Sequence, residues 1–248
     1  MLLRDDLTLA LDPVLFAHEL GIVPDDWQAV ALRSPSRRQL WNACRQSGKS
    51  TTAAIMALHR ATFYDRSLVL MVSPSLRQSS ELYRRVREMG AAAPSPMPMV
   101  EDTKTSLTMS NGSRIVSLPS SESTIRGYSA VDLLIFDEAS RVEDPLYYST
   151  RPMLAVSGGT IAALSTPFGT RGWWYEAWRS SEPWERVEIP ATTCSRISAA
   201  FLAEEQRTLG AFWFEQEYLC KFVEAESQAF RRADIERAFS EEVEAWAL

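Results

Sequence analysis

The sequence predicts an α/β fold in which a mostly parallel central sheet is flanked by helices. A continuous apolar run, Leu68–Val72, and a second mostly apolar stretch, Val131–Phe136, have the length of strands that are covered on both faces. Helical patterns separate the apolar runs, which favours parallel strands joined by crossover helices. With 248 residues, of which 46% are hydrophobic, the chain can bury the core of one large domain.

Composition and charge narrow the class of protein further. The formal net charge of −6 argues against nucleic-acid binding through bulk electrostatics, although one basic patch remains possible. Cys44, Cys194 and Cys220 are far apart in the sequence and lack paired metal spacing, so a reduced, intracellular protein is expected. The sequence has two histidines, His18 and His59, which makes a metal site built from histidines unexpected. No signal peptide or membrane-length apolar run is present, which predicts a soluble cytoplasmic domain without a membrane partner.

The N-terminal part, about residues 1–35, reads as a helical lead-in. One helix is expected over Asp12–Leu20, where apolar residues recur at helical spacing before Gly21. A second helix is expected to begin at Pro24, a favoured first-turn residue, and to end near Arg33.

The central part alternates strands and helices. Besides the two apolar runs, the predicted elements are strands over Leu40–Ala43, Thr160–Leu164 and Glu185–Ile189, and helices over Ser50–Tyr64, Leu76–Met89, Pro145–Leu154 and Trp173–Arg179. The arginines and glutamates of the helix 76–89 indicate a solvated face, with a DNA-facing role as the less favoured alternative. A loop is expected over Gly90–Pro98. A small β-hairpin is expected around Asn111-Gly112, a pair suited to a type I′ turn.

The C-terminal part is predicted to be helical. Helices over Ala199–Leu209 and Ala211–Phe222 would form a lid-like subdomain over about residues 195–223. The charged segment 224–248 reads as a linker with one short helix near Ala233–Phe239.

The stretch between the first sheet strand and the next helix predicts a phosphate-binding loop. Backbone N–H groups and a helix N-terminus can surround an anion there, Lys49 can reach the β- and γ-phosphates of a nucleotide, and the Ser50 hydroxyl can ligate Mg²⁺. The full pattern asks for glycine five positions before Gly48, where this chain has Ala43. A chance Gly-Lys-Ser triplet on an exposed loop is the alternative.

Two carboxylates end the strand Leu133–Phe136 at the edge of the sheet where ligands bind in open α/β folds. Asp137 can hold Mg²⁺ together with Ser50, and Glu138 can orient and deprotonate the water that attacks the γ-phosphate. A simple strand cap is the alternative reading of this pair. The position of the Asp137-Glu138 pair, downstream of Lys49-Ser50, favours a nucleotide site. The loop and the carboxylate pair are two independent parts of such a site, and they occur in the required order.

A third polar stretch, Ser165-Thr166-Pro167, also follows a predicted buried strand. Its hydroxyl groups can bond the γ-phosphate or its water and relay the loss of that phosphate. A plain turn explains the same residues equally well. Together, the three stretches predict a P-loop NTPase of the ASCE, RecA-like class.

The chain also resembles the ATPase (motor) domain of the large terminase subunits of tailed bacteriophages, over about residues 25–222. The segments that carry the resemblance are Pro24-Asp25-Asp26-Trp27-Gln28, Arg45-Gln46-Ser47-Gly48-Lys49-Ser50, Ile125-Arg126-Gly127-Tyr128-Ser129, Leu133-Leu134-Ile135-Phe136-Asp137-Glu138-Ala139, and Ser165-Thr166-Pro167 with the aromatic stretch Gly172-Trp173-Trp174-Tyr175-Glu176. The segment 45–50 looks like the family's variant Walker A motif, in which arginine follows a small residue and the first glycine is often missing. The segment 133–139 is similar to the family's Walker B motif. The segment 165–167, with the aromatic stretch after it, is similar to the family's coupling motif.

The resemblance implies roles for individual residues. It implies that ATP is bound by Gln28, Arg45, Gln46, Ser47, Gly48, Lys49, Ser50 and Thr51. Gln28 would read the adenine, and Arg126 would act across a subunit boundary as an arginine finger, with Arg141, Arg151 and Arg171 as alternatives. Ser165, Thr166 and Pro167 would couple hydrolysis to motion.

The resemblance also implies a biological setting. It implies a Mg²⁺-dependent ATPase that moves double-stranded DNA into a procapsid, working as a homo-oligomeric ring on a capsid portal with a small terminase subunit. The expected place of action is the cytoplasm of the infected bacterial host. The family's large subunits carry a second, nuclease domain. Because residues 224–248 resemble the linker to it, no nuclease activity is expected from this chain.

Two other functions fit part of the pattern. A DEAD/DEAH-type helicase also has a glutamine motif and an Asp-Glu strand end, but such proteins carry two motor cores and a different tetrad from Asp-Glu-Ala-Ser. A nucleotide-binding scaffold without turnover would need Lys49 but not Glu138.

Overall fold

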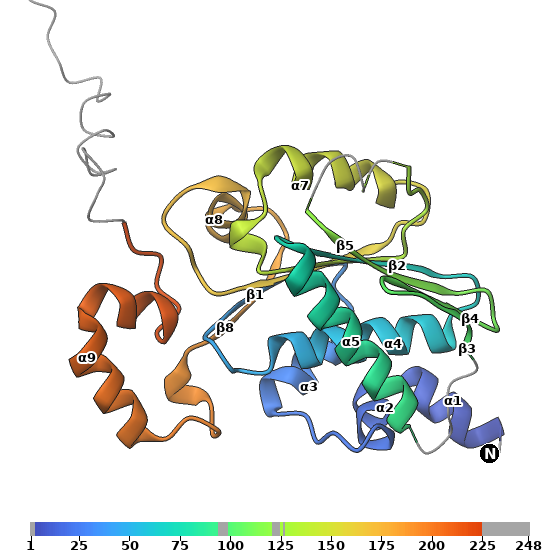
Figure 1. Ribbon diagram of the computed structural model, residues 1–248, viewed down its shortest axis with the longest axis horizontal. Helices are drawn as coiled ribbons and strands as arrows, with labels where there is room; N and C mark the ends of the chain where they lie inside the picture. The colour runs from blue at the N-terminus through green and yellow to red at the C-terminus, as the bar shows by residue number, and fades with distance from the viewer. Residues whose placement is uncertain (1–2, 94–98, 121–124, 126, 225–248) are drawn as a thin grey trace, which may run out of the picture.

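The computed structural model describes residues 3–93, 99–120, 125 and 127–224 (Figure 1). In this part of the chain one sheet has the strand order β3-β4-β5-β2-β6-β7-β1-β8. The strands are β1 (Arg38–Ala43), β2 (Leu68–Ser73), β3 (Met99–Asp102), β4 (Ser106–Met109), β5 (Arg114–Pro119), β6 (Leu133–Asp137), β7 (Thr160–Ser165) and β8 (Glu185–Ile189). In this order, each strand from β5 through β2, β6, β7 and β1 to β8 is parallel to the next. Strand β4 is antiparallel to both β3 and β5. The predicted α/β fold with a mostly parallel sheet is confirmed.

Helices cover both faces of the sheet (Figure 1). They are α1 (Leu3–Leu11), α2 (Pro13–Glu19), α3 (Asp26–Arg33), α4 (Lys49–Phe63), α5 (Leu76–Ala92), α7 (Asp144–Thr150), α8 (Gly172–Arg179) and α9 (Ala199–Glu217), with short 3₁₀ turns at Ala139–Arg141, Arg151–Leu154 and Ala191–Thr193. Helices α7 and α8 lie on one face, whereas α1 to α5 lie on the other, and α9 lies to the side of the β8 edge (Figure 1).

The side chains of strand β2 show why the sheet is buried on both faces. Val69 and Met71 belong to the apolar cluster that includes α4 and α5, and Leu70 and Val72 belong to the cluster that includes α7 and α8. Successive strand residues point to opposite faces, so a run of apolar residues supplies both clusters at once. This is the physical reason that the strand reads as a continuous run in the sequence.

The strand order brings the three polar stretches of the sequence together. Strand β7 lies between β6 and β1, with Asp137 in register with Leu164 and Ser165 in register with Asn42. Because the three strands are parallel, the residues that follow them all emerge at the same edge of the sheet.

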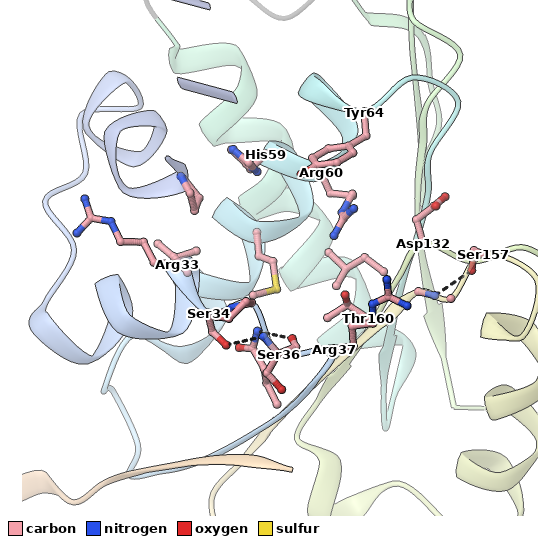
Figure 2. Close-up of a pocket in the computed structure, with 18 of the residues that line it drawn as sticks. Arg33, Ser34, Ser36, Arg37, His59, Arg60, Tyr64, Asp132, Ser157 and Thr160 are labelled. Atoms are coloured by element: carbon pink, nitrogen blue, oxygen red, sulfur yellow. Dashed lines mark hydrogen bonds between the residues drawn. The ribbon is translucent and has the colours of Figure 1, made fainter. Parts of the chain in front are cut away.

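The opposite edge of the sheet holds a separate cavity. The N-terminal ends of β1, β6 and β7 line a space of about 430 Å³ together with α4 and the segment 33–37 (Figure 2). Nothing in the sequence pattern predicted this cavity.

Several predicted boundaries differ from the structure for local reasons. The hairpin turn is not type I′: Gly112 has φ +81°, but Asn111 is not among the residues with positive φ, and Gly112 N donates to Met109 O at 3.0 Å. This is a type I turn followed by a left-handed glycine, in which Asn111 Nδ2 instead donates to Ala61 O.

Other differences concern the ends of helices. Helix α3 begins at Asp26 rather than Pro24, because Gln28 Oε1 accepts a hydrogen bond from the N-cap Asp25 N. Helix α5 continues through Gly90 to Ala92, and strand β3 follows where no strand was predicted. The predicted break between the two C-terminal helices is present, because Gly210 inside α9 has the non-helical angles φ +75° and ψ +166°, but the second helix ends at Glu217 rather than Phe222.

Some predictions fall outside the described residues. These are the assignment of Arg126, the linker 225–248 and its short helix near Ala233–Phe239. Within the described part of the chain, no helix is long and apolar enough to cross a membrane.

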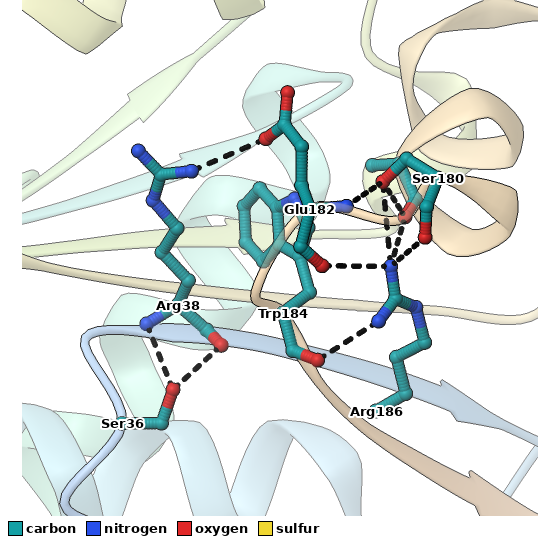
Figure 3. A network of polar contacts seen from close by, with 7 residues as sticks. Ser36, Arg38, Ser180, Glu182, Trp184 and Arg186 are labelled. Atoms are coloured by element: carbon teal, nitrogen blue, oxygen red, sulfur yellow. Dashed lines mark hydrogen bonds and ion pairs between the residues drawn. The ribbon is translucent and has the colours of Figure 1, made fainter.

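Arg186 joins the end of α8 to strand β8 (Figure 3). Its guanidinium group donates hydrogen bonds to the carbonyl oxygens of Trp178, Ala177, Ser180 and Trp184 at 2.7–2.9 Å. The carbonyls of Ala177 and Trp178 lie in the last turn of α8, where carbonyl groups lack partners within the helix. One cation therefore holds the turn that leads into the edge strand.

Replacing Arg186 by methionine should lower the free energy of unfolding by about 2 kcal/mol, because several half-buried carbonyls lose a charged donor. Urea denaturation measures the change. The matched control is Arg207→Met on α9, where the exposed arginine Nε donates only to Ala203 O. If the two variants were equally stable, the proposed anchoring by Arg186 would be wrong.

Candidate active site

The loop between β1 and α4 has the backbone form of an anion-binding nest. Gln46 has φ +60° and Gly48 has φ +96°, both in the left-handed region that turns successive N–H groups to one side. Ser47 Oγ donates to Cys44 O at 2.9 Å and braces the loop. A Cβ at position 48 would lie 2.7 Å from Gln28 Nε2, so both the backbone angle and the space require glycine.

Lys49 lies at the first position of α4, with only 6% of its surface exposed. Its Nζ donates to Ala43 O at 3.0 Å and Cys44 O at 3.2 Å, so the ammonium group folds back over the loop. An ammonium group at this point, beside the positive end of α4, suits a phosphate ligand.

Asp137 at the end of β6 is buried and incompletely partnered. Its Oδ1 has no hydrogen-bond partner among the described residues. Burial together with the nearby Glu138 carboxylate raises the pKa of Asp137 to about 7, against the opposing effect of Lys49. The free carboxylate oxygen of Asp137 and the hydroxyl of Ser50 in the first turn of α4 are oxygen ligands of the kind that Mg²⁺ takes. The donor set therefore fits the ion that the sequence predicts.

Glu138 adopts φ +50° and ψ +48°, a left-handed conformation that is unfavourable for a residue with a Cβ. The strain turns the chain sharply at the end of β6 and brings the Glu138 side chain to the same cleft as Lys49. Strained backbone of this kind clusters at functional sites.

The third polar stretch contacts the turn that follows Glu138. Ser165 Oγ donates to Ser140 Oγ at 2.7 Å and accepts a hydrogen bond from Ser140 N at 3.2 Å. Arg141 lies 4.1 Å above the ring of Phe168, just beyond Pro167. Thr166 is buried at the same strand end. The end of β7 and the Glu138 turn are thus directly connected.

Gln28 and Arg45, predicted from the resemblance, lie beside the loop but have protein partners. Gln28 Nε2 donates to Gly48 O at 3.2 Å and to Thr52 Oγ1 at 2.8 Å. The Arg45 guanidinium forms an ion pair with Glu217 at the end of α9, although the arginine side chain is 63% exposed. Both predictions of nucleotide contact remain predictions.

A cleft of about 800 Å³ is lined by the loop residues 45–51, Glu138 and Arg141, and also by arginines that the sequence motifs did not indicate. Arg196, just before α9, donates to Ser47 O and to Asp25 Oδ2. Arg85 of α5 donates to Thr51 Oγ1 at 2.8 Å, so this arginine does not belong to a purely solvated face, whereas Arg84 pairs with Glu81 and Glu88 as such a face requires. Sequence spacing carries no signal for either Arg196 or Arg85, because the fold brings them to the loop from distant segments.

Comparison with curated proteins finds relatives with a common description. The large terminase subunits of Thermus phage G20c and Thermus virus P23-45 are each 27% identical to this chain over 180 residues. The match covers 65% of this chain but 37% of each relative, so the chain spans little more than a third of the length of these proteins.

Comparison with solved structures gives the same fold. The ATPase domain of the Thermus phage P74-26 large terminase superposes with a TM-score of 0.73 at 21% identity, covering 84% of this chain and 98% of that one. The large terminase of bacteriophage D6E in complex with ATP-γ-S superposes with a TM-score of 0.63 at 13% identity, covering 80% and 52%. At these identities the likeness establishes the architecture, and the motor-domain fold predicted from the motifs is confirmed.

A sequence model of one family extends this agreement along most of the chain. The family is described as the terminase large subunit, T4likevirus-type, N-terminal, and it matches residues 40–237. The match takes in the phosphate loop, the carboxylates after β6 and the hydroxyl residues after β7, which the fold has brought to one edge. The chain therefore belongs to the terminase large subunit family, in its N-terminal part.

Proposed function

We propose that this chain is a Mg²⁺-dependent ATPase that drives double-stranded viral DNA into a procapsid. The supporting observation is that the polar stretches with Lys49, Glu138 and Thr166 follow the adjacent parallel strands β1, β6 and β7 at one edge of the sheet, where Lys49 and Glu138 line one cleft. Phosphoryl transfer to water requires groups that hold the phosphates, groups that hold the metal ion and a group that positions the water. The nest before Lys49, the buried Asp137 and the adjacent Glu138 are suited to these three tasks.

Residues of the cleft and Asp137 at the end of β6 divide the chemistry among them. Lys49 and Arg45 would hold the phosphates, Ser50 and Asp137 would hold Mg²⁺, and Glu138 would accept the proton of the attacking water. Bound Mg²⁺ would neutralise charge that develops on the phosphate oxygens.

Arg45 would have to exchange partners to contact a nucleotide. The arginine is mostly exposed, but its present partner Glu217 is only 11% exposed, so contacts with the phosphates would have to outweigh the cost of leaving a buried carboxylate without its cation. Gln28 would likewise have to give up bonds to Gly48 and Thr52 before reading an adenine. We propose both contacts as features of the nucleotide-bound form.

The end of β7 would relay the state of the nucleotide. Because Ser165 bonds the turn after Glu138, a movement of that turn on loss of the γ-phosphate would reach Thr166 and Pro167 without an intermediary. This connection supports the proposed coupling role of the three residues.

The proposed partners follow from the family. We propose that the chain acts in a homo-oligomeric ring on a capsid portal, with a small terminase subunit, in the cytoplasm of the infected host. Arg126 is proposed as the arginine that enters a neighbour's cleft; it follows Ile125, whose side chain is buried in the α7–α8 cluster. The D6E large terminase is described in complexes with ATP-γ-S and with ADP, which supports ATP as the nucleotide.

Phosphate release, measured against protein concentration with and without double-stranded DNA, tests the proposal. A finger supplied in trans should make the dilute protein a poor ATPase, with the rate per chain rising about tenfold or more on assembly. A rate per chain that is high at nanomolar protein and indifferent to concentration and DNA would exclude a trans-activated packaging motor. Helicase function would instead appear as strand separation of a duplex.

A further inference from the structure

The cavity at the N-terminal ends of β1, β6 and β7 lies across the sheet from the ATP cleft. Because β1, β6 and β7 are parallel, their carboxyl ends lie at one edge of the sheet and their amino ends at the other. Lys49 and Glu138 lie at the carboxyl ends, and the amino ends line this cavity. None of the described residues that line one space lines the other. The cavity is therefore distinct from the site of ATP hydrolysis.

The described residues around the cavity carry unbalanced positive charge. Three arginines line it, with Asp132 as the acid among them. Arg33 is neutralised by Asp12, with which it forms two hydrogen bonds at 3.0 and 2.6 Å. Asp132 directs Oδ2 to Leu68 N at 2.8 Å, which occupies one of its two oxygens.

Arg37 and Arg60 have no carboxylate partner among the described residues. Figure 2 shows their side chains entering the cavity from different walls, Arg37 from the segment before β1 and Arg60 from α4. The Arg60 guanidinium lies 4.2 Å from the centre of the Tyr64 ring, which orients it without neutralising it. Two guanidinium groups that share one concave space repel each other unless an anion lies between them.

The cavity wall is shaped to hold Arg37 in place. A Cβ at Gly158 would lie 2.9 Å from Arg37 Nη1, and Gly158 has φ +60°. A Cβ at Gly159 would lie 2.2 Å from Val131 O. Ser157 Oγ accepts a hydrogen bond from Gly159 N at 3.2 Å and fixes this turn. Glycine at position 158 allows the arginine to lie against the backbone, and glycine at position 159 allows this turn to pack against Val131.

We propose that this cavity binds a phosphate-bearing ligand, with its phosphate between Arg37 and Arg60. Guanidinium groups match phosphate oxygens with paired hydrogen bonds, and a volume of about 430 Å³ falls within the range of small-molecule sites. The phosphate belongs either to a free compound, such as a nucleotide or pyrophosphate, or to the backbone of a DNA strand. The site is independent of the proposed ATPase function.

Equilibrium dialysis of the full chain with radiolabelled pyrophosphate tests the site. The phosphate loop is first disabled by Lys49→Met, so that the remaining binding reports on the cavity alone. One equivalent should stay bound in Lys49→Met, and adding Arg37→Gln and Arg60→Gln should weaken it at least about tenfold. Adding Arg37→Lys and Arg60→Lys instead should give binding between these two levels, because the charges remain but the paired guanidinium hydrogen bonds are lost.

The matched control adds Arg207→Gln, an exposed arginine on α9, and should leave binding unchanged. Thermal unfolding followed by circular dichroism confirms that each variant is folded. No pyrophosphate bound to Lys49→Met, or equal binding after loss of Arg37 and Arg60, would overturn the proposal. If the unsubstituted chain failed to hydrolyse ATP, the proposed ATPase function would be wrong. The pyrophosphate binding measured in Lys49→Met would still support the cavity site.

A competition arm identifies the source of the phosphate. A 20-base-pair duplex is added to Lys49→Met with pyrophosphate bound. Displacement by the duplex, together with weaker binding of the labelled duplex to the chain that also carries Arg37→Gln and Arg60→Gln, assigns the site to a DNA backbone. Retention of pyrophosphate in the presence of excess duplex assigns it to a free phosphate compound.

Discussion

Replacing Glu138 by glutamine is expected to lower the rate of ATP hydrolysis by about 10²–10⁴-fold while leaving ATP affinity near that of the unsubstituted chain. The amide keeps the size and the hydrogen-bonding reach of the carboxylate but cannot accept a proton from water. Glu138 lies in the cleft beside the loop, and its left-handed backbone would be retained because the change is confined to the end of the side chain. Phosphate release under single-turnover conditions measures the rate.

Glu143→Gln is the matched control, because Glu143 is an exposed glutamate five residues further along the chain. This variant should hydrolyse ATP normally. Binding of a fluorescent ATP analogue to both variants separates loss of chemistry from loss of affinity. Equal, negligible phosphate release from the unsubstituted chain and from Glu138→Gln, under conditions that permit assembly, would favour a nucleotide-binding scaffold over a motor.

Lys49→Met is expected to weaken ATP binding by at least about 30-fold, since truncating one partner of a close charged pair costs about 2–5 kcal/mol. The ammonium group donates to the carbonyls of Ala43 and Cys44, and ATP would supply phosphate oxygens in their place. Methionine keeps the length of the side chain without a donor. Titration of a fluorescent ATP analogue measures the affinity.

Lys104→Met removes an exposed lysine outside the cleft and should bind ATP normally. Thermal unfolding in the absence of nucleotide shows whether the buried carbonyls tolerate the change. Unaltered ATP affinity in a folded Lys49→Met chain would contradict the assignment of this loop as the phosphate site.

The predictable part of the fold rests on local patterns. Strands β2 and β6 are buried on both faces, so their apolar runs carry a strong signal, and their polar ends mark the functional edge. The alternation of strands and helices then predicted parallel pairing, and the pairing brought Asp137 and Ser165 to one edge. The predicted roles of these residues await the measurements described above.

What the sequence could not predict depends on contacts between distant segments. Arg196 reaches Ser47 from a loop about 150 positions away, and Arg85 reaches Thr51 from the next helix. The hairpin turn differs from type I′ because Asn111 bonds the end of α4, a tertiary contact that outweighs the preference of the dipeptide. Periodicity carries no information of this kind.

The contact between α3 and the phosphate loop bears on where the folding unit begins. Gln28 bonds Gly48 and Thr52, and in the preceding helix Phe16 packs edge-on against His59 and Phe63 of α4. The family match starts only at residue 40. A truncated chain that began there would leave the apolar side of α4 open to water and the loop unsupported. Expression boundaries drawn from family alignments would therefore cut through the support of the loop that they aim to preserve.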